Sequence, residues 1–193
     1  MSHTVTFIDG DTTGPEICEA IHPLFSAAGA EVTWERWSLD DNFEASEDLL
    51  ASIREHGAAL MAYTWGRRHE GQPAPIISLR RKLGCYANLR PLVHLPGIDS
   101  VYEDVDIIVV RELTEDIYAA MEHESIPNVF ESFKVTTRSS CERIARYAFE
   151  VARINGRKKV TIAHKSNIMK LSDGMFLRTA QKVALEYPEI ETE

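Results

Sequence analysis

Short β-type segments alternate with amphipathic helical segments along the first half of the chain, and this alternation limits the folds that the chain can adopt. The predicted strands are residues 5–8, 31–37 and 58–62, and the predicted helices between them are residues 15–28 and 45–55. Pro15 suits the first turn of a helix, and Gly29 and Gly57 follow the two helices as stop signals. A β-α-β-α-β order is typical of a parallel or mixed sheet flanked by helices, so the sequence predicts an α/β fold.

The rest of the chain has a more mixed pattern. A helix is predicted at 76–83, and strands are predicted at 86–93, 105–110, 128–137 and 159–163. The strand at 128–137 alternates as an exposed antiparallel strand does, and the strand at 159–163 is predicted to be buried. Ser139 or Ser140 can cap a long helix that stops at Asn155-Gly156, and Ser172 can cap a final helix. We assign residues 1–98 to one α/β domain and residues 99–193 to a smaller mixed domain.

The charge, hydropathy and cysteine content of the chain limit which partners it can bind and which cellular compartment it can occupy. A formal net charge of -9 argues against a nucleic-acid partner, which needs a basic face. No run approaches the ~18 apolar residues of a membrane span, and the N-terminus has no signal-peptide pattern. Cys18, Cys85 and Cys141 are scattered without a CxxC pair, which favours reduced thiols and no zinc site of that kind. We therefore expect a cytoplasmic protein with no nucleic-acid or membrane partner.

Polar side chains gather where two β-rich apolar runs end. Residues 111–118 follow the run 105–110, and residues 164–170 follow the run 160–163. Open α/β sheets place ligand sites at strand ends, and a phenol and an amine are usual tools for proton transfer next to a carbonyl. One cluster alone is better explained as surface charge, and a lone tyrosine as a packing residue. Two clusters together favour a site.

Arginines strengthen this interpretation. Arg80, Arg90 and Arg111 are spaced so that one helix and two strand ends could converge on one pocket. Guanidinium groups bind carboxylates through two parallel hydrogen bonds, which suits a di- or tricarboxylate ligand. Arg80 on its own is equally well explained as a solvated helix residue.

Several longer motifs carry a family resemblance. They are Gly10-Asp11-Thr12-Thr13-Gly14-Pro15-Glu16, Leu79-Arg80-Arg81, Tyr86-Ala87-Asn88-Leu89-Arg90-Pro91, Arg111 to Tyr118, Glu122-His123, and His164 to Asp173-Gly174. In this order, from Val5 nearly to Glu193, they resemble the isocitrate/isopropylmalate dehydrogenases, which are β-decarboxylating dehydrogenases. The resemblance implies an incomplete α/β fold of that family, with a mixed sheet flanked by helices. Residues 1–98 would be part of its large domain, and residues 99–193 its small, dimerisation-side domain.

The resemblance also implies roles for individual residues. Arg80, Arg90 and Arg111 match the arginines that hold the carboxylates of a 2-hydroxy acid such as isocitrate or 3-isopropylmalate. Tyr118 matches the tyrosine that protonates the enol carbon after loss of carbon dioxide. Lys165 matches the lysine that works with the 2-hydroxyl and reaches the site of a partner subunit, which implies a homodimer.

Further matches concern the cofactors. Thr114, Glu115 and Asn167 match the stretches that face the nicotinamide cofactor, which is NAD or NADP in the family. The family also uses Mg²⁺ or Mn²⁺, but the aspartates that bind this metal in the family have no counterpart in this chain. The resemblance therefore implies both cofactors and assigns no metal ligand.

The chain departs from the family pattern at several positions. Ala74 and Ile76 stand where a serine and an asparagine usually contact the substrate, so Arg67, Arg68 or His69 could supply those contacts instead. Leu113 replaces the usual Asn or Thr, Asp116 stands where Gly is frequent, and Thr12-Thr13 replaces Gly-Ile. A C-terminal segment that completes the family's large domain is also missing.

Three functions follow from these matches and departures. The first is an NAD(P)- and metal-dependent oxidative decarboxylase of a 2-hydroxy acid, truncated and inactive as this fragment. The second is a non-catalytic module that binds carboxylates and dimerises. The third is a repurposed enzyme that performs metal-free proton transfer with Tyr118 and Lys165. The residues leave open the choice between NAD and NADP and the identity of the hydroxy acid.

Overall fold

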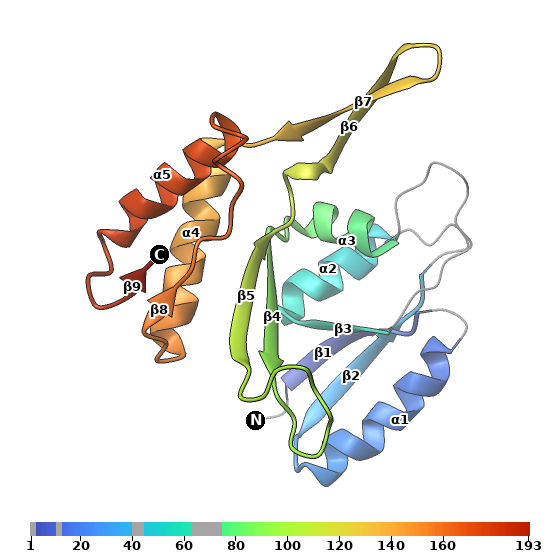
Figure 1. The fold of residues 1–193 in the computed structure, drawn as a ribbon. Coiled ribbons are helices and arrows are strands. Elements are labelled where there is room, and N and C mark those ends of the chain that lie inside the picture. Colours follow the sequence, from blue (N-terminus) through green and yellow to red (C-terminus); the bar gives the residue numbers. More distant parts are fainter. Residues whose placement is uncertain (1–2, 11–12, 40–44, 63–74) are drawn as a thin grey trace. The chain divides into compact units, whose positions relative to one another are not determined.

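A computed structural model describes residues 3–10, 13–39, 45–62 and 75–193 of the chain (Figure 1). The chain divides into two compact units, Met1–Gly84 and Cys85–Glu193. Within the described residues no helix is long and apolar enough to cross a membrane.

Unit 1 is a small parallel sheet with helices. Its elements are β1 (His3–Ile8), α1 (Gly14–Ala27), β2 (Val32–Trp37), α2 (Glu47–His56), β3 (Ala59–Met61) and α3 (Pro75–Leu83). The strand order is β2-β1-β3, and both pairs are parallel. The predicted alternation of strands and helices is therefore confirmed, with boundaries that shift by one or two residues at most ends.

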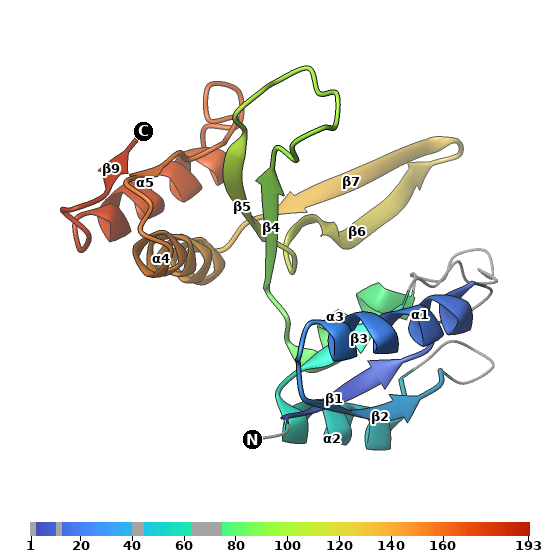
Figure 2. The ribbon, with the colours of Figure 1, turned by 90° about the horizontal axis from the view of Figure 1, so that it is seen from below.

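Helices cover both faces of this sheet, and the central strand β1 is buried on both faces. Successive side chains of a strand point to opposite faces, and Phe7 and Ile8 are both fully buried. Phe7 packs with Cys18 of α1, whereas Ile8 packs with Leu49 of α2 and Leu79 of α3. Figure 2 shows α1 on one side of the sheet and α2 on the other.

Unit 2 contains three separate strand pairs and two long helices. Its elements are β4 (Ala87–Val93), β5 (Asp106–Glu112), β6 (Asp116–Ile126), β7 (Val129–Val135), α4 (Arg138–Ile154), β8 (Lys159–Val160), α5 (Ser172–Ala184) and β9 (Glu191–Thr192). The pairs β4–β5 and β6–β7 are antiparallel, and β8–β9 is parallel. The mixed strand pairing predicted for this half is thus present.

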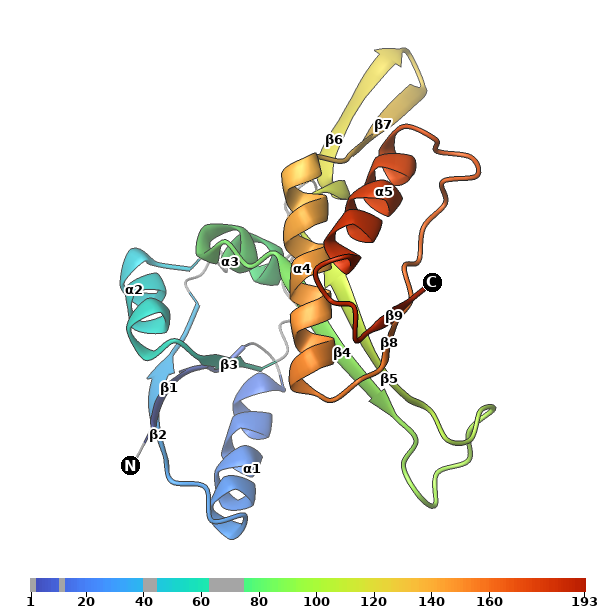
Figure 3. The same ribbon diagram turned by 90° about the vertical axis from the view of Figure 1, so that its left-hand side faces the viewer.

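The core of unit 2 lies between α4 and α5, which run side by side (Figure 3). Phe149 of α4 stacks on Tyr187, with ring centroids 5.1 Å apart, and Ala180 and Val183 of α5 complete the cluster. These side chains recur at helical spacing, so each helix presents one apolar stripe to the other.

The pair β6–β7 forms a hairpin that projects from the rest of unit 2 (Figure 1). Asn128 turns the chain with φ 67°, a left-handed conformation that asparagine tolerates better than most residues. Many of the hairpin's large apolar side chains are exposed, among them Met121, Phe130 and Phe133. A two-stranded ribbon is marginally stable alone, so this apolar surface is a notable feature of the unit.

Some local predictions were wrong. Helix α4 is capped by Thr137, whose hydroxyl accepts from the Ser140 N–H at 3.3 Å, and not by Ser139 or Ser140. Ser172 begins α5 but does not cap it, because the cap position is Leu171 and no side chain bonds there.

The predicted buried strand at 159–163 is also wrong. It is reduced to the short β8, and none of its residues is fully buried. Strand β6 was not predicted, because irregular pairing between Asp116 and Met121 interrupts its alternation.

The division between the two units along the chain falls at a different residue from the predicted domain boundary at 98/99. Strand β4 pairs along its whole length with β5, so residues 87–93 belong with the unit that follows Gly84. The assignment of complete domains stays a prediction.

Candidate functional site

The turn between β5 and β6 brings two predicted site residues together. Arg111 lies near the end of β5, and Tyr118 lies near the start of β6. The Arg111 guanidinium donates to the Tyr118 hydroxyl, and its central carbon lies 4.5 Å from the centre of the Tyr118 ring. Tyr118 is 40% exposed, so it remains open to a ligand while its oxygen is oriented by a cation.

The register of β4 and β5 adds Arg90 to this group. Asn88 lies opposite Arg111, and Arg90 lies opposite Val109. Opposed residues share a face and residues two apart along a strand share it too, so Arg90 and Arg111 are diagonal neighbours on one face. Diagonal positions are typically about 7–8 Å apart, which lets two guanidinium groups hold one dicarboxylate.

A pocket of about 400 Å³ lies beside Arg111 and Tyr118 within unit 2. Side chains of β5, β6, β7, α4 and α5 line it, together with the segment after β8; among them are Lys134, Cys141, His164 and Asp173. Burial raises the pKa of the Cys141 thiol, so that side of the pocket carries a neutral group near pH 7. Arg90, Thr114, Lys165 and Asn167 are not among the lining residues.

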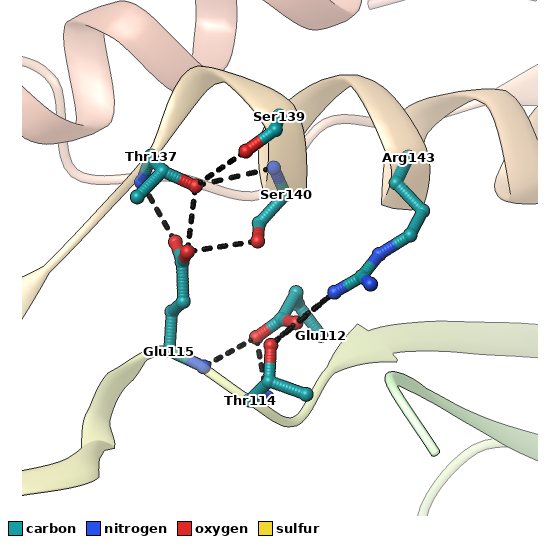
Figure 4. A network of polar contacts seen from close by, with 7 residues as sticks. All are labelled: Glu112, Thr114, Glu115, Thr137, Ser139, Ser140 and Arg143. Carbon is teal, nitrogen blue, oxygen red and sulfur yellow. Dashed lines mark hydrogen bonds and ion pairs between the residues drawn. The ribbon is translucent and has the colours of Figure 1, made fainter. Parts of the chain in front are cut away.

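Glu115 joins the turn after β5 to the N-terminus of α4 (Figure 4). Its carboxylate accepts from the Thr137 N–H at 2.7 Å, from the Thr137 hydroxyl at 2.6 Å and from the Ser140 hydroxyl at 2.8 Å. Partial burial alone would raise the pKa of Glu115, but these hydrogen bonds outweigh it and hold the pKa below its ordinary value. The Glu115 side chain, which was predicted to face the cofactor, is thus hydrogen-bonded to the start of helix α4.

Glu112 organises the same turn from its other side. Its carboxylate accepts from the Thr114 N–H at 2.7 Å and from the Glu115 N–H at 2.9 Å. Arg143 of α4 lies 3.6 Å from Glu112 and donates to the Thr114 hydroxyl at 3.3 Å (Figure 4). Its guanidinium also lies 4.1 Å from the centre of the Tyr86 ring. Thr114 is therefore held in place at the turn.

Lys134 and Asp173 lie in the pocket and were missed as a pair by sequence reasoning. The Lys134 ammonium contacts Asp173 at 2.5 Å and Asp116 at 3.2 Å. Burial alone would raise the pKa of Asp173, but the hydrogen bonds from Lys134 and the Lys165 N–H hold it below its ordinary value. Asp173 stood in the motif His164 to Asp173-Gly174 without an assigned role, and Lys134 had no signal beyond an exposed strand pattern.

The segment after β8 carries Lys165 and Asn167, both exposed. The Lys165 carbonyl accepts from the Ile168 N–H at 3.1 Å and from the Met169 N–H at 2.9 Å, which closes a turn. The side chains of Lys165 and Asn167 are thus presented to solvent from a folded turn, where a ligand or another chain can reach them.

Arg80 lies in α3 of unit 1, next to the buried Leu79. Ile76, at a departure from the family pattern, packs against the core of the same unit. Arg67, Arg68, His69 and Ala74 lie outside the described residues. Among those that are described, no group of three or more His, Cys, Asp or Glu side chains is arranged to hold a metal ion.

Comparison with known proteins adds independent information. The family model described as "Isocitrate/isopropylmalate dehydrogenase" matches residues 4–193. The chain is 42% identical over 192 residues to a mitochondrial NAD isocitrate dehydrogenase regulatory subunit of Dictyostelium discoideum, covering 98% of this chain and 53% of that protein. It is 38% identical to the mitochondrial NAD isocitrate dehydrogenase subunit 2 of Schizosaccharomyces pombe, covering 98% of this chain and 52% of that one.

The fold is similar to that of solved structures as well. The crystal structure of isocitrate dehydrogenase from Methylococcus capsulatus matches with a TM-score of 0.88 and 36% identity, covering 98% of this chain and 59% of that chain. The predicted fold class is therefore confirmed. The chain spans about half the length of the curated relatives that it matches.

The prediction of a cytoplasmic protein is wrong. The curated relatives are named as mitochondrial proteins. The prediction rested partly on reduced cysteines, and Cys18, Cys85 and Cys141 are indeed free thiols. Reduced thiols are compatible with more than one reducing compartment, so they could not distinguish between them.

Proposed function

Since the chain belongs to the isocitrate/isopropylmalate dehydrogenase family, we propose that it carries the substrate-binding and proton-transfer residues of an NAD-dependent oxidative decarboxylase. The substrate class is a 2-hydroxy di- or tricarboxylate, with isocitrate first among the candidates because its relatives are named for it. The observation that carries the proposal is the contact between Arg111 and Tyr118, together with the position of Arg90 on the same face of the β4–β5 pair as Arg111.

Each of these side chains has a distinct task in the proposal. Arg90 and Arg111 bind the carboxylates of the substrate, and Arg80 is proposed for the same task from its motif. Tyr118 donates its proton to the enol carbon that loss of carbon dioxide leaves. Arg111 orients the phenol and keeps positive charge beside the oxygen that gives up the proton. Lys165, from its exposed turn, exchanges a proton with the 2-hydroxyl.

The cofactors enter the proposal in different ways. When bound, NAD would supply a hydride acceptor for the hydroxyl-bearing carbon, and Thr114 and the exposed Asn167 are the side chains that would contact it. Glu115 is better assigned to positioning, because its carboxylate bonds to the start of α4. The carboxylates of the described residues do not gather in a group fit for Mg²⁺ or Mn²⁺, so no step is assigned to a cation here.

Carboxylate binding tests the proposal directly by titration calorimetry with isocitrate and with 3-isopropylmalate. A charge-assisted hydrogen bond is worth ~1.5–3 kcal/mol, and we expect an affinity on the order of millimolar for the 193-residue chain. Arg90→Ala and Arg111→Ala should each weaken binding by at least about tenfold. Arg153→Ala, an exposed arginine of α4 that pairs with Glu150, is the matched control and should leave binding unchanged. Equal losses in all three variants would contradict the proposal.

A second candidate function is a regulatory subunit that binds the carboxylate without turning it over. Its support is that the relative with 42% identity is named as a regulatory subunit, and that Ile76 replaces a polar substrate contact. Deuterium exchange from solvent into the product 2-oxo acid is followed by NMR with Mg²⁺ present. Exchange that Tyr118→Phe abolishes while binding persists would support the proton-transfer role of Tyr118 and count against a purely regulatory role. Exchange that persists in Tyr118→Phe would contradict that role of Tyr118.

We also propose that the chain associates with a second copy or with a homologous subunit through unit 2. Met121 is 54% exposed and Phe130 is 72% exposed, so the hairpin presents large apolar side chains to solvent. Such a surface marks an interaction site more often than a monomer surface. The relatives are named as subunits, and Lys165 in an exposed turn can reach a neighbouring chain.

A further inference from the structure

Lys134 contacts carboxylates from two different elements. Its ammonium lies 2.5 Å from Oδ1 of Asp173 on α5 and 3.2 Å from Oδ2 of Asp116 on β6. The Lys134 side chain is 23% exposed and that of Asp173 is 8% exposed, so the pair is largely withdrawn from water. Screening by solvent is reduced at such a site, and removal of either partner leaves a partly buried charge without its counterion.

Asp173 holds the turn that carries Lys165. Its second oxygen, Oδ2, accepts from the Lys165 backbone N–H at 2.8 Å. The Lys165 carbonyl in turn closes the turn by accepting from Ile168 and Met169. The backbone of Lys165 is therefore anchored to the carboxylate that Lys134 fixes.

Asp116 ties the same ammonium to the strand that carries Tyr118. It is the first residue of β6, and its Oδ1 accepts from the Ile117 N–H at 2.7 Å. Tyr118 follows two positions later along the strand. The Lys134 ammonium is thus linked through the Asp116 carboxylate to the backbone next to Tyr118. Through the Asp173 carboxylate it is linked to the backbone of Lys165.

We propose that Lys134 is a positioning residue that fixes the Lys165 turn, and with it the spacing between the backbones of Lys165 and Tyr118. This inference rests on the proposed function for its consequence, since Lys165 and Tyr118 are the proton-transfer residues of that proposal. Lys134 acts through Asp173 and Asp116 and has no task in bond making or breaking.

The test measures the Lys165 turn itself, so it does not depend on turnover. Hydrogen exchange of the Lys165 amide is followed by NMR in the 193-residue chain. Lys134→Met should accelerate this exchange by about tenfold, because Asp173 loses the partner that orients its carboxylate. The amide of Asn155, which donates to Val151 at the far end of α4, is the internal reference and should not change.

Three companion variants separate positioning from general stability. Lys134→Arg, which keeps a cation within reach of both carboxylates, should restore slow exchange at Lys165. Lys159→Met removes a lysine that pairs with Glu191 and Glu193 elsewhere in unit 2, and should leave Lys165 unaffected. Asp173→Ala should match or exceed the effect of Lys134→Met. Far-ultraviolet circular dichroism establishes that each variant is folded.

A pH titration supplies a readout that a merely structural role would not move. The amide shift of Lys165 should follow the ionisation of Asp173, whose charged neighbours are Lys134 and His164; Asp116 shares Lys134 with it. Lys134→Met should raise the midpoint of this titration, and Lys134→Arg should return it.

Unchanged exchange and an unchanged midpoint in Lys134→Met would overturn the inference. Equal acceleration at Lys165 and Asn155 would overturn it too, because the substitution would then act on the whole unit. If the proposed function fails, the calorimetric titration shows no carboxylate binding while the Lys165 amide still responds to Lys134.

Discussion

Asp116 occupies a backbone conformation that few side chains adopt. Its φ is 64°, in the left-handed region where an ordinary residue is strained and where aspartate and asparagine are better tolerated. The aspartate also offsets this strain through its contacts with Lys134 and with the Ile117 N–H. Glycine, which is frequent at this position of the family pattern, fits the same conformation without strain but makes neither contact.

This comparison yields a paired prediction. Asp116→Gly should change the free energy of unfolding by less than about 1 kcal/mol, because relief of strain offsets the lost contacts. Asp116→Ala should destabilise by about 1–2 kcal/mol, because alanine keeps the strain and loses the contacts. Chemical denaturation of both variants measures the difference. An alanine variant as stable as the glycine variant would show that the left-handed conformation costs nothing here.

A carboxylate from outside helix α4 accepts hydrogen bonds at the N-terminus of that helix. Thr137 caps the helix, and Glu115 then accepts from both the N–H and the hydroxyl of Thr137 and from Ser140. A negative charge at a helix N-terminus is favoured by the unpaired N–H groups and by the helix dipole. The same contacts fix the turn between Arg111 and Tyr118, so the stability of α4 and the geometry of the turn are linked.

Removal of the negative charge of Glu115 should lower the free energy of unfolding. We expect Glu115→Gln to destabilise the chain by about 1–2 kcal/mol, since the hydrogen bonds lose their charged acceptor. Glu142→Gln is the matched control in the first turns of the same helix, where the glutamate is 53% exposed and pairs only weakly with Arg146. That control should cost less than about 0.5 kcal/mol. Thermal or urea unfolding provides the measurement, and equal costs would assign Glu115 to the solvated surface.

At the scale of the molecule, the proposed association through the exposed hairpin can be tested by substitution. The double substitution Met121→Glu/Phe130→Glu should raise the dissociation constant of the oligomer by at least about a hundredfold, because burial of each such side chain is worth ~1.5–3 kcal/mol. Ile154→Glu/Leu185→Glu alters two side chains that are 79% and 81% exposed outside the hairpin, and should have little effect. Sedimentation velocity over a range of concentrations compares the variants. A monomeric unsubstituted chain at micromolar concentration would refute the proposed association.

Periodic features of the fold were predictable from the sequence, and non-periodic ones were not. Apolar spacing identified the helices of both units and the parallel strands of unit 1, because burial of one stripe or of both strand faces leaves a regular pattern. The cap of α4 was misassigned because Thr137, Ser139 and Ser140 all offer a hydroxyl, and only backbone conformation selects one. Strand β6 escaped prediction because Asp116 and Ala120, both with positive φ, break its alternation.

The contacts of the candidate site likewise fall into those that the sequence could predict and those that it could not. Arg111 and Tyr118 could be paired from a motif, since they lie seven positions apart on either side of a turn. Lys134 and Asp173 are 39 positions apart, and nothing in their local sequence indicates that they meet. Contacts of this kind depend on the packing of a hairpin against a helix, which periodicity does not encode.

Acidification should dismantle the site before the core. The carboxylates of Glu115 and Asp173 have pKa values held below their ordinary ranges, so their stabilising contacts are complete above about pH 4.5 and are lost as the pH falls through the lowered values. The cluster of Phe149, Ala180 and Val183 contains no carboxylate, and its apolar contacts do not titrate, although the hydrogen bond from Tyr187 in this cluster to Glu150 weakens in acid. In acid, unit 2 would therefore retain its paired helices while the turn of Lys165 and the start of α4 come loose, a partly folded state with native helix content and an open pocket.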